Sequence, residues 1–278
     1  MRLGLNAKSA SARCQATENG LLKAFGILLF SLLLLLAACS GGASQPLPAP
    51  APTVPPPSPV SITPNHSTVS QIQTLPAWDS CTLCAGENGN GPLTDYSLQQ
   101  FVQTPSLSGS AAKYFVGGTP WGAALWWKAV GGDDSVRNFV YELDFYFENP
   151  GVSQAVEFDV NQNAGGFRYV FATECDLGNT HTWRVADNTG HWISSGVSCP
   201  TPRAKSWNHL TWEFQRTDGV LNYVAVTLNG VRSKVDRSFP ANAQADAYRY
   251  FDVAFQMDLD GVPDNYSVWL DNISLTYW

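Results

Sequence analysis

The chain has 278 residues, which is enough for one large domain or two small ones, and its formal net charge is −7. Only 14% of the residues are charged, whereas 12% are aromatic and 23 are glycine, a profile typical of β-rich extracellular proteins. The acidic balance argues against nucleic acid as a partner, because phosphate binding requires a basic surface.

Residues 1–38 are predicted to be a signal peptide. A basic segment precedes the apolar run Ala24–Leu36, which is too short for a comfortable membrane span. The run ends in Leu-Ala-Ala-Cys, and this resembles the bacterial lipoprotein signal. The resemblance implies export, cleavage before Cys39, and lipidation of Cys39 as a membrane anchor in the cell envelope. An ordinary secretory signal with an incidental cysteine is the alternative.

Residues 39–77 are rich in proline and poor in charge, which predicts a disordered, semi-rigid linker. All 10 tryptophans lie at or after Trp78, so the globular domain is expected to span residues 78–278. No window of this part shows a 3.6-residue period, and turn signals separate short strand-like runs. Such a pattern favours a sandwich or a barrel, and a domain of this length needs two packed sheets.

The clearest strand patterns are Phe139–Glu148 and Gln154–Gln162, in which apolar and polar residues alternate strictly around a short turn. Side chains two positions apart share a face of a strand. We therefore expect four of the acidic residues of the two runs to form one outward-facing patch on neighbouring strands. These residues are Glu142, Asp144, Glu157 and Asp159.

Three later segments carry a family resemblance. Trp207–Trp212 (WNHLTW) and Val226–Val231 (VTLNGV) look like paired strands of laminin-G and concanavalin A-like domains. Val268–Leu275 (VWLDNISL) is similar to the closing strand of jelly-roll carbohydrate-binding domains. The resemblance implies an all-β, two-sheet antiparallel jelly-roll sandwich of the concanavalin A-like lectin and glucanase type.

The segment Glu157–Asn161 (EFDVN) resembles the E-x-D-x-E strand of retaining glucanases built on this fold. The resemblance implies that Glu157 would be the nucleophile and Asp159 its helper. Asn161 stands where the acid should be, and an amide cannot donate a proton as a carboxylic acid does. A hydrolase would therefore need an acid from another strand, for which Glu142, Asp144, Glu213 and Asp258 are the candidates.

Three functions stay open at this stage: non-catalytic carbohydrate binding, glycoside hydrolysis, and a structural or adhesive role in the envelope. Sugar sites combine aromatic faces with carboxylate and amide groups, which favours binding to a glycan or polysaccharide. Adjacent residues of a strand point to opposite faces, so one of two neighbouring tryptophans should face outward. The expected ligand-binding residues are Glu142, Asp144, Glu157, Asp159, Asn161, Trp126, Trp127 and Gln256.

Four cysteines of the exported domain allow three pairings, of which Cys81–Cys84 with Cys175–Cys199 is favoured over a redox or zinc site. Asp258, Asp260 and Asp264 gather oxygen ligands in one turn. Jelly-roll relatives often hold a structural calcium, so the turn is either such a calcium site or an ordinary acidic turn. No other cofactor is expected.

Overall fold

The computed structural model describes residues 66–86, 91–244 and 248–278. Contacts divide the chain into two compact units, and the described residues all belong to the unit that includes Ser61–Trp278. The predicted signal peptide, Cys39 and the linker as far as residue 65 lie outside the described residues. Within these ranges no helix has the length and apolar character needed to cross a bilayer.

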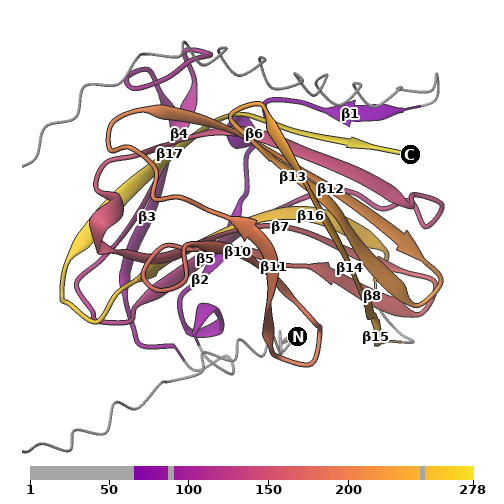
Figure 1. The fold of residues 1–278 in the computed structure, drawn as a ribbon. Helices are drawn as coiled ribbons and strands as arrows, with labels where there is room; N and C mark the ends of the chain where they lie inside the picture. The colour runs from indigo at the N-terminus through magenta and orange to yellow at the C-terminus, as the bar shows by residue number, and fades with distance from the viewer. Residues whose placement is uncertain (1–65, 87–90, 245–247) are drawn as a thin grey trace, which may run out of the picture. The chain divides into compact units, whose positions relative to one another are not determined.

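The described residues form two antiparallel sheets that lie one above the other (Figure 1). The eight-stranded sheet contains, in spatial order, β14 (Val231–Pro240), β13 (Val220–Leu228), β12 (Trp207–Thr217), β6 (Asn138–Phe147), β17 (Asn265–Tyr277), β4 (Ala111–Gly117) and β3 (Asp95–Val102), with β1 (Ser67–Val69) paired to β17. The nine-stranded sheet contains β11 (Trp192–Ser198), β10 (Thr182–Ala186), β9 (Thr173–Asp176), β7 (Ser153–Ala164), β16 (Tyr250–Leu259), β5 (Ala123–Gly131) and β2 (Asp79–Cys81), with β8 (Phe167–Phe171) between β7 and β15 (Asn242–Ala243). Three single 3₁₀ turns, Ile72–Thr74, Leu83–Ala85 and Pro150–Val152, complete the named elements.

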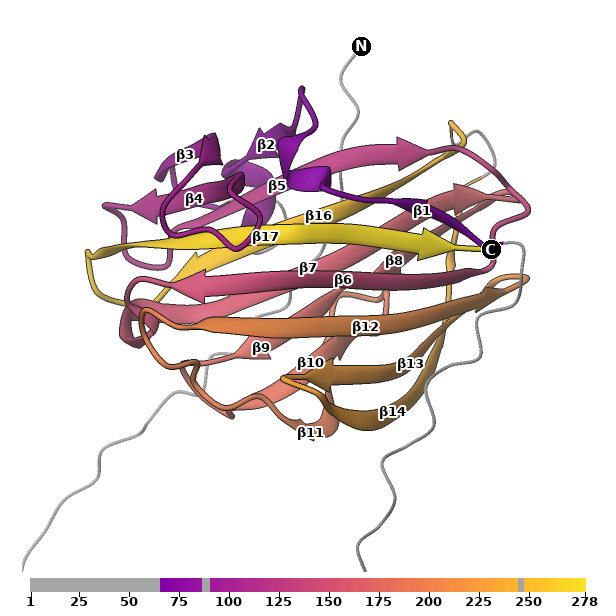
Figure 2. The same cartoon turned by 90° about the horizontal axis from the view of Figure 1, so that it is seen from above.

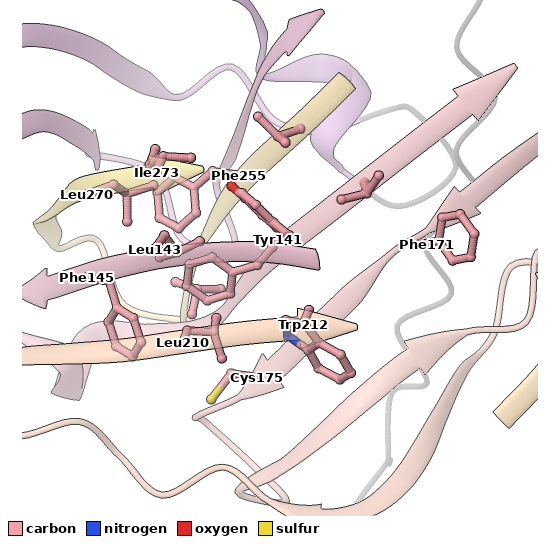
Figure 3. Close-up of a cluster of buried hydrophobic side chains, with 14 of the residues drawn as sticks. Tyr141, Leu143, Phe145, Phe171, Cys175, Leu210, Trp212, Phe255, Leu270 and Ile273 are labelled. Carbon is pink, nitrogen blue, oxygen red and sulfur yellow. The ribbon is translucent and has the colours of Figure 1, made fainter. Parts of the chain in front are cut away.

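Alternate residues of each strand fill the space between the layers. Tyr141, Leu143 and Phe145 point inward from β6, and Trp212 joins them from β12 (Figure 3). Phe158 of the opposite sheet packs against Phe145 and Phe255, with ring centroids 5.6 Å and 5.3 Å apart. Burial of these large apolar side chains is the main stabilising contribution to the sandwich. The predicted fold class, an all-β two-sheet antiparallel jelly-roll sandwich, is confirmed.

The expected acidic patch on neighbouring strands is wrong. β6 pairs with β12 and β17, whereas β7 pairs with β16, β8 and β9 in the other sheet. The 3₁₀ turn Pro150–Val152 between them therefore carries the chain from one sheet to the other rather than closing a hairpin. Seen from above, β6 crosses over β7 (Figure 2). The acidic residues of β6 and β7 therefore face away from each other.

The sandwich begins before the predicted boundary at residue 78. β1 pairs with the end of β17, and Ile72 is fully buried in the core. Part of the predicted linker 39–77 thus belongs to the folded unit. The two predicted disulfides, Cys81–Cys84 and Cys175–Cys199, are both present.

Candidate functional site

A cavity of about 550 Å³ lies on the outer face of the nine-stranded sheet. Its floor comes from alternate residues of β5, β7, β8 and β16, because the residues between them point into the core. The 3₁₀ turn Leu83–Ala85 and the turn before β11 add to its lining. The ionisable and amide side chains among the lining residues are Glu157, Asp159, Asn161, Arg168, Asn188, His191, Asn242, Gln244, Tyr250, Asp252 and Gln256.

Three aromatic side chains line the same cavity: Trp127 of β5, Trp192 of β11 and Tyr250 of β16. The expectation that one of two neighbouring tryptophans faces outward holds for Trp127. Ligand binding by Trp126 is a wrong prediction, because its ring is buried in the core 5.1 Å from the ring of Tyr114. The strand alternation that exposes one ring to the cavity buries the other.

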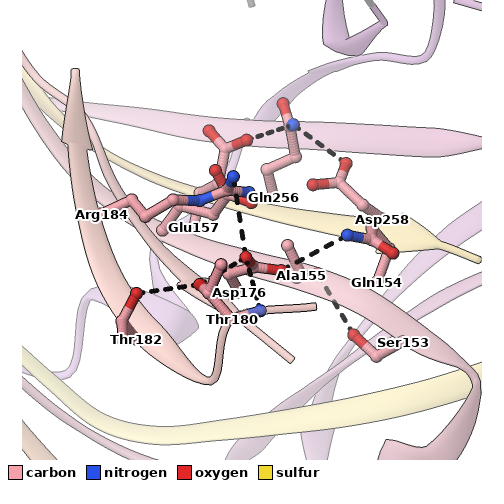
Figure 4. Close-up of polar contacts among 11 residues, drawn as sticks. Ser153, Gln154, Ala155, Glu157, Asp176, Thr180, Thr182, Arg184, Gln256 and Asp258 are labelled. Carbon is pink, nitrogen blue, oxygen red and sulfur yellow. Dashed lines mark hydrogen bonds and ion pairs between the residues drawn. The ribbon is translucent and has the colours of Figure 1, made fainter. Parts of the chain in front are cut away.

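Hydrogen bonds across strands fix the floor. The Gln256 amide nitrogen donates to Glu157 Oε1 at 2.6 Å and to Asp258 Oδ1 at 3.0 Å (Figure 4). The Asn161 amide nitrogen donates to Asp252 Oδ1 at 2.8 Å, since these two residues face each other in the register of β7 and β16. Each amide thus holds a carboxyl group in one orientation.

Burial changes the ionisation of this floor. Glu157 and Asp159 are only 7% and 5% exposed, so they are far less solvated than an outward-facing patch would be. Burial raises the pKa of Glu157 well above its usual range, and the nearby carboxyls of Asp258 and Asp159 raise it further. Burial also raises the pKa of Asp159, against one hydrogen bond from the backbone of Thr173. Burial therefore favours the uncharged form of both carboxyl groups.

Two further carboxyls titrate near neutrality. Burial raises the pKa of Asp252 to about 7, although the Asn161 hydrogen bond and the Arg168 charge both oppose the shift. Burial raises the pKa of Glu174 to about 7 as well, against the charge of Arg184. Arg184 forms ion pairs with Glu174 and with Asp176, the latter at 3.6 Å (Figure 4).

Glu142 and Asp144 lie on the eight-stranded sheet, away from the cavity, and a ligand site shared with Glu157 and Asp159 is therefore a wrong prediction. His209 lies beside both, with Nδ1 2.9 Å from Asp144 Oδ1 and Nε2 3.2 Å from Glu142 Oε1. Asp144 also accepts a hydrogen bond from Asn272. Both acidic residues therefore have partners within the protein, and their presence on this strand face needs no ligand to explain it.

The predicted calcium ligands do not converge. Asp258 accepts from Gln256, Asp260 Oδ1 accepts from the backbone of Val262, and Asp264 Oδ1 accepts from the backbone of its neighbour. No group of three or more His, Cys, Asp or Glu residues in the described ranges is arranged to hold a metal ion. The structural calcium therefore stays a prediction.

Sequence reasoning missed Asp252, Arg168 and Tyr250. One signal was available for Asp252. It lies four positions before Gln256 in Tyr250–Leu259, so the two side chains share a face of the strand. Arg168 lies on the opposite face of β8 from Phe167 and Tyr169, but β8 is only five residues long. Its position near Asp252 depends on the order of the strands in the sheet, and the alternation within one strand does not reveal that order.

No protein-family model and no curated protein matches the sequence. Solved structures with a similar course of the chain include a carbohydrate-binding module of the β-sandwich superfamily, with 11% identity and a TM-score of 0.39 over 72% of this chain and 57% of that one. A carbohydrate esterase from the Shiga toxin-encoding bacteriophage phi24B has 12% identity and a TM-score of 0.44, covering 76% of this chain and 99% of that one. The carbohydrate recognition domain of Emp47p has 12% identity and a TM-score of 0.44, covering 76% and 94%. No property of the cavity is assigned from these similarities, and the fold rests on the strand pairing given above.

Proposed function

We propose that the chain binds carbohydrate non-catalytically in the cavity of the nine-stranded sheet. The observation that carries the proposal is the presence of Trp127, Trp192 and Tyr250 in one cavity with carboxyl and amide side chains. Aromatic faces pack on the C–H faces of sugar rings, and the polar groups bind hydroxyls and set orientation. A volume of about 550 Å³ lies within the range of small-molecule sites.

The ionisation of the floor favours binding over catalysis. A carboxyl nucleophile must be ionised to attack a sugar, whereas burial favours the uncharged form of Glu157. One of its oxygens is already bound to Gln256. A protonated carboxyl can donate a hydrogen bond to a hydroxyl oxygen, which is a recognition role.

Substitution of Trp127 tests the proposal. A glycan array identifies ligands, and calorimetry then measures their affinity for the wild type and for Trp127→Ala. We expect affinity to fall about five- to thirtyfold, because the variant removes a stacking contribution of roughly 1–2 kcal/mol. Trp121→Ala is the matched control, since Trp121 is 60% exposed and does not line the cavity. If no glycan binds, or if both variants bind as well as the wild type, the proposal fails.

A retaining glycoside hydrolase is the second candidate, and Asp252 is the observation that favours it. Asp252 is hydrogen-bonded to Asn161, the residue that occupies the acid's position in the resemblance to glucanases. Its pKa of about 7 suits a general acid, with Glu157 as nucleophile and Asp159 beside it. Release of reducing ends from a bound glycan, abolished in Glu157→Gln, would establish hydrolysis. If neither binding nor release is observed, a structural or adhesive envelope domain is the remaining candidate.

Membrane anchoring belongs to the same proposal. The two disulfides of the described domain suit an oxidising compartment, which agrees with export. Metabolic labelling with a radioactive fatty acid should mark the wild type and leave Cys39→Ala unlabelled and released from the membrane fraction. Labelling of the variant, or a soluble wild type, would contradict the anchor.

A further inference from the structure

Arg168 is a basic residue that lines the cavity. It alternates on β8 with Tyr169, whose side chain is buried, so its own side chain lies on the cavity side. In the sheet register Arg168 stands between Asn163 of β7 and Asn242 of β15, and neither carries a charge. Across the described residues, no ion pair or hydrogen bond engages its guanidinium group.

Two other basic side chains near this sheet already have acidic partners. Arg184 pairs with Glu174 and Asp176. His191 also lines the cavity, but its Nδ1 lies 3.0 Å from Asp187 Oδ2. Arg168 is thus the permanent positive charge that a ligand in the cavity could reach without breaking an existing ion pair among the described residues.

The buried carboxyl groups of Glu157, Asp159 and Asp252 oppose this charge less than exposed carboxylates would. Burial raises the pKa values of Glu157 and Asp159 and so favours their uncharged forms. Asp252 is the carboxyl on which Arg168 acts, and its pKa of about 7 leaves it largely neutral in mildly acidic solution. In mildly acidic solution Arg168 is therefore opposed by less negative charge than its acidic neighbours would carry if they were exposed.

We propose, building on carbohydrate binding in this cavity, that the ligand is an acidic glycan whose carboxylate or sulfate group is bound by Arg168. The guanidinium fork can donate two parallel hydrogen bonds to a planar carboxylate, and such bidentate pairs are among the stronger hydrogen bonds in proteins. The neighbouring Asn242 and Gln244 line the same part of the cavity and can bind the adjacent hydroxyls.

The test compares charged and neutralised forms of the same glycan. Calorimetry measures a panel of oligouronides, the same oligouronides as methyl esters, sulfated oligosaccharides and neutral oligosaccharides, with the wild type, Arg168→Gln, Arg168→Lys and Trp127→Ala. The wild type should bind at least one charged form about tenfold or more tightly than its neutral counterpart, and Arg168→Gln should abolish that difference. Arg168→Lys should retain part of it. Arg237→Gln, an exposed arginine of β14, is the control and should change nothing.

The pH dependence gives a second readout. Asn161 of β7, Arg168 of β8 and Tyr250 of its own strand surround Asp252, and β5 places Ala129 opposite it. Ionisation of Asp252 above pH 7 places a negative charge beside the bound anion. Affinity for the charged ligand should therefore fall as pH rises through about 7, while affinity for the ester stays constant.

The outcomes separate the two proposals. If no glycan of any charge binds, carbohydrate binding itself fails. If neutral glycans bind in a manner that depends on Trp127, but no charged form is preferred or the preference survives Arg168→Gln, only the acidic-glycan proposal is overturned. Preference for carboxylates over sulfates, or the reverse, identifies the anion.

Discussion

The pKa values of two buried aspartates in this protein shift in opposite directions. The number of hydrogen-bond donors around each carboxyl group decides the direction. Asp271 is fully buried and accepts hydrogen bonds from Ser106, from Ser108 and from the backbone of Leu107. Burial acts to raise its pKa, but these donors outweigh it, and the pKa is lowered. Asp252 has one amide donor, Asn161, and there burial prevails.

Asp271 therefore should matter for stability. Asp271→Ala leaves several donors of the loop at residues 106–108 without an acceptor, so we expect a loss of roughly 2–4 kcal/mol in the free energy of unfolding. Urea denaturation measures this loss. Asp218→Ala, at an 83% exposed side chain, is the control and should lie within about 0.5 kcal/mol of the wild type. An equal effect of both substitutions would contradict the assigned role of the Asp271 hydrogen bonds.

At the scale of elements, the sequence predicts individual strands better than their neighbours. Period-two alternation identifies β6 and β7 correctly and separates Phe158, which is buried in the core, from Glu157, which faces the cavity. It cannot tell which strands pair, because alternation reports only the two faces of one strand. Glu142 was therefore assigned to the same surface as Glu157, although the two face away from each other across the sandwich.

Local pattern also fails where tertiary packing determines a residue's role. Arg216 continues the inward positions Trp212 and Phe214 of β12, a place where an apolar residue is expected. The structure satisfies its guanidinium with the Val136 carbonyl oxygen and with Gln162 Oε1 of the other sheet. Arg216 and these two partners come from three separate segments, so no short window of sequence contains them all.

The Cys175–Cys199 disulfide ties β9 to the end of the β10–β11 hairpin, which carries Trp192 of the cavity. The closed loop of 24 positions implies a stabilisation of about 3 kcal/mol through restriction of the unfolded chain. We expect the double variant Cys175→Ala/Cys199→Ala to lose about that much stability in denaturation and to bind glycan more weakly. Unchanged stability and binding would show that the hairpin is held by packing alone.

For the whole molecule, Asp271 limits stability at low pH and Asp252 limits it at higher pH. The folded-state pKa of Asp271 is lowered, so its contribution is present above the unfolded value of about 3.9 and is lost as pH falls below it. The folded-state pKa of Asp252 is raised to about 7, so stability is lost as pH rises from about 4 to about 7. Glu174, also at about 7, acts in the same direction. The sandwich should therefore be most stable in mildly acidic solution.

Asp252→Asn tests this balance, because an amide preserves the shape but cannot ionise. The free energy of unfolding of the wild type should decrease between about pH 4 and pH 7, and the variant should lose part of that slope, on the order of 2–4 kcal/mol over the window. Asp218→Asn, which replaces an exposed carboxyl, should leave the profile unchanged. Addition of an acidic glycan should favour the protonated form of Asp252 and extend the stable range to higher pH, since a ligand that binds only the folded state stabilises it. A wild-type profile that rises from pH 4 to pH 7 would mean that Asp252 is already ionised in the folded protein, and its negative charge would then oppose that of Arg168.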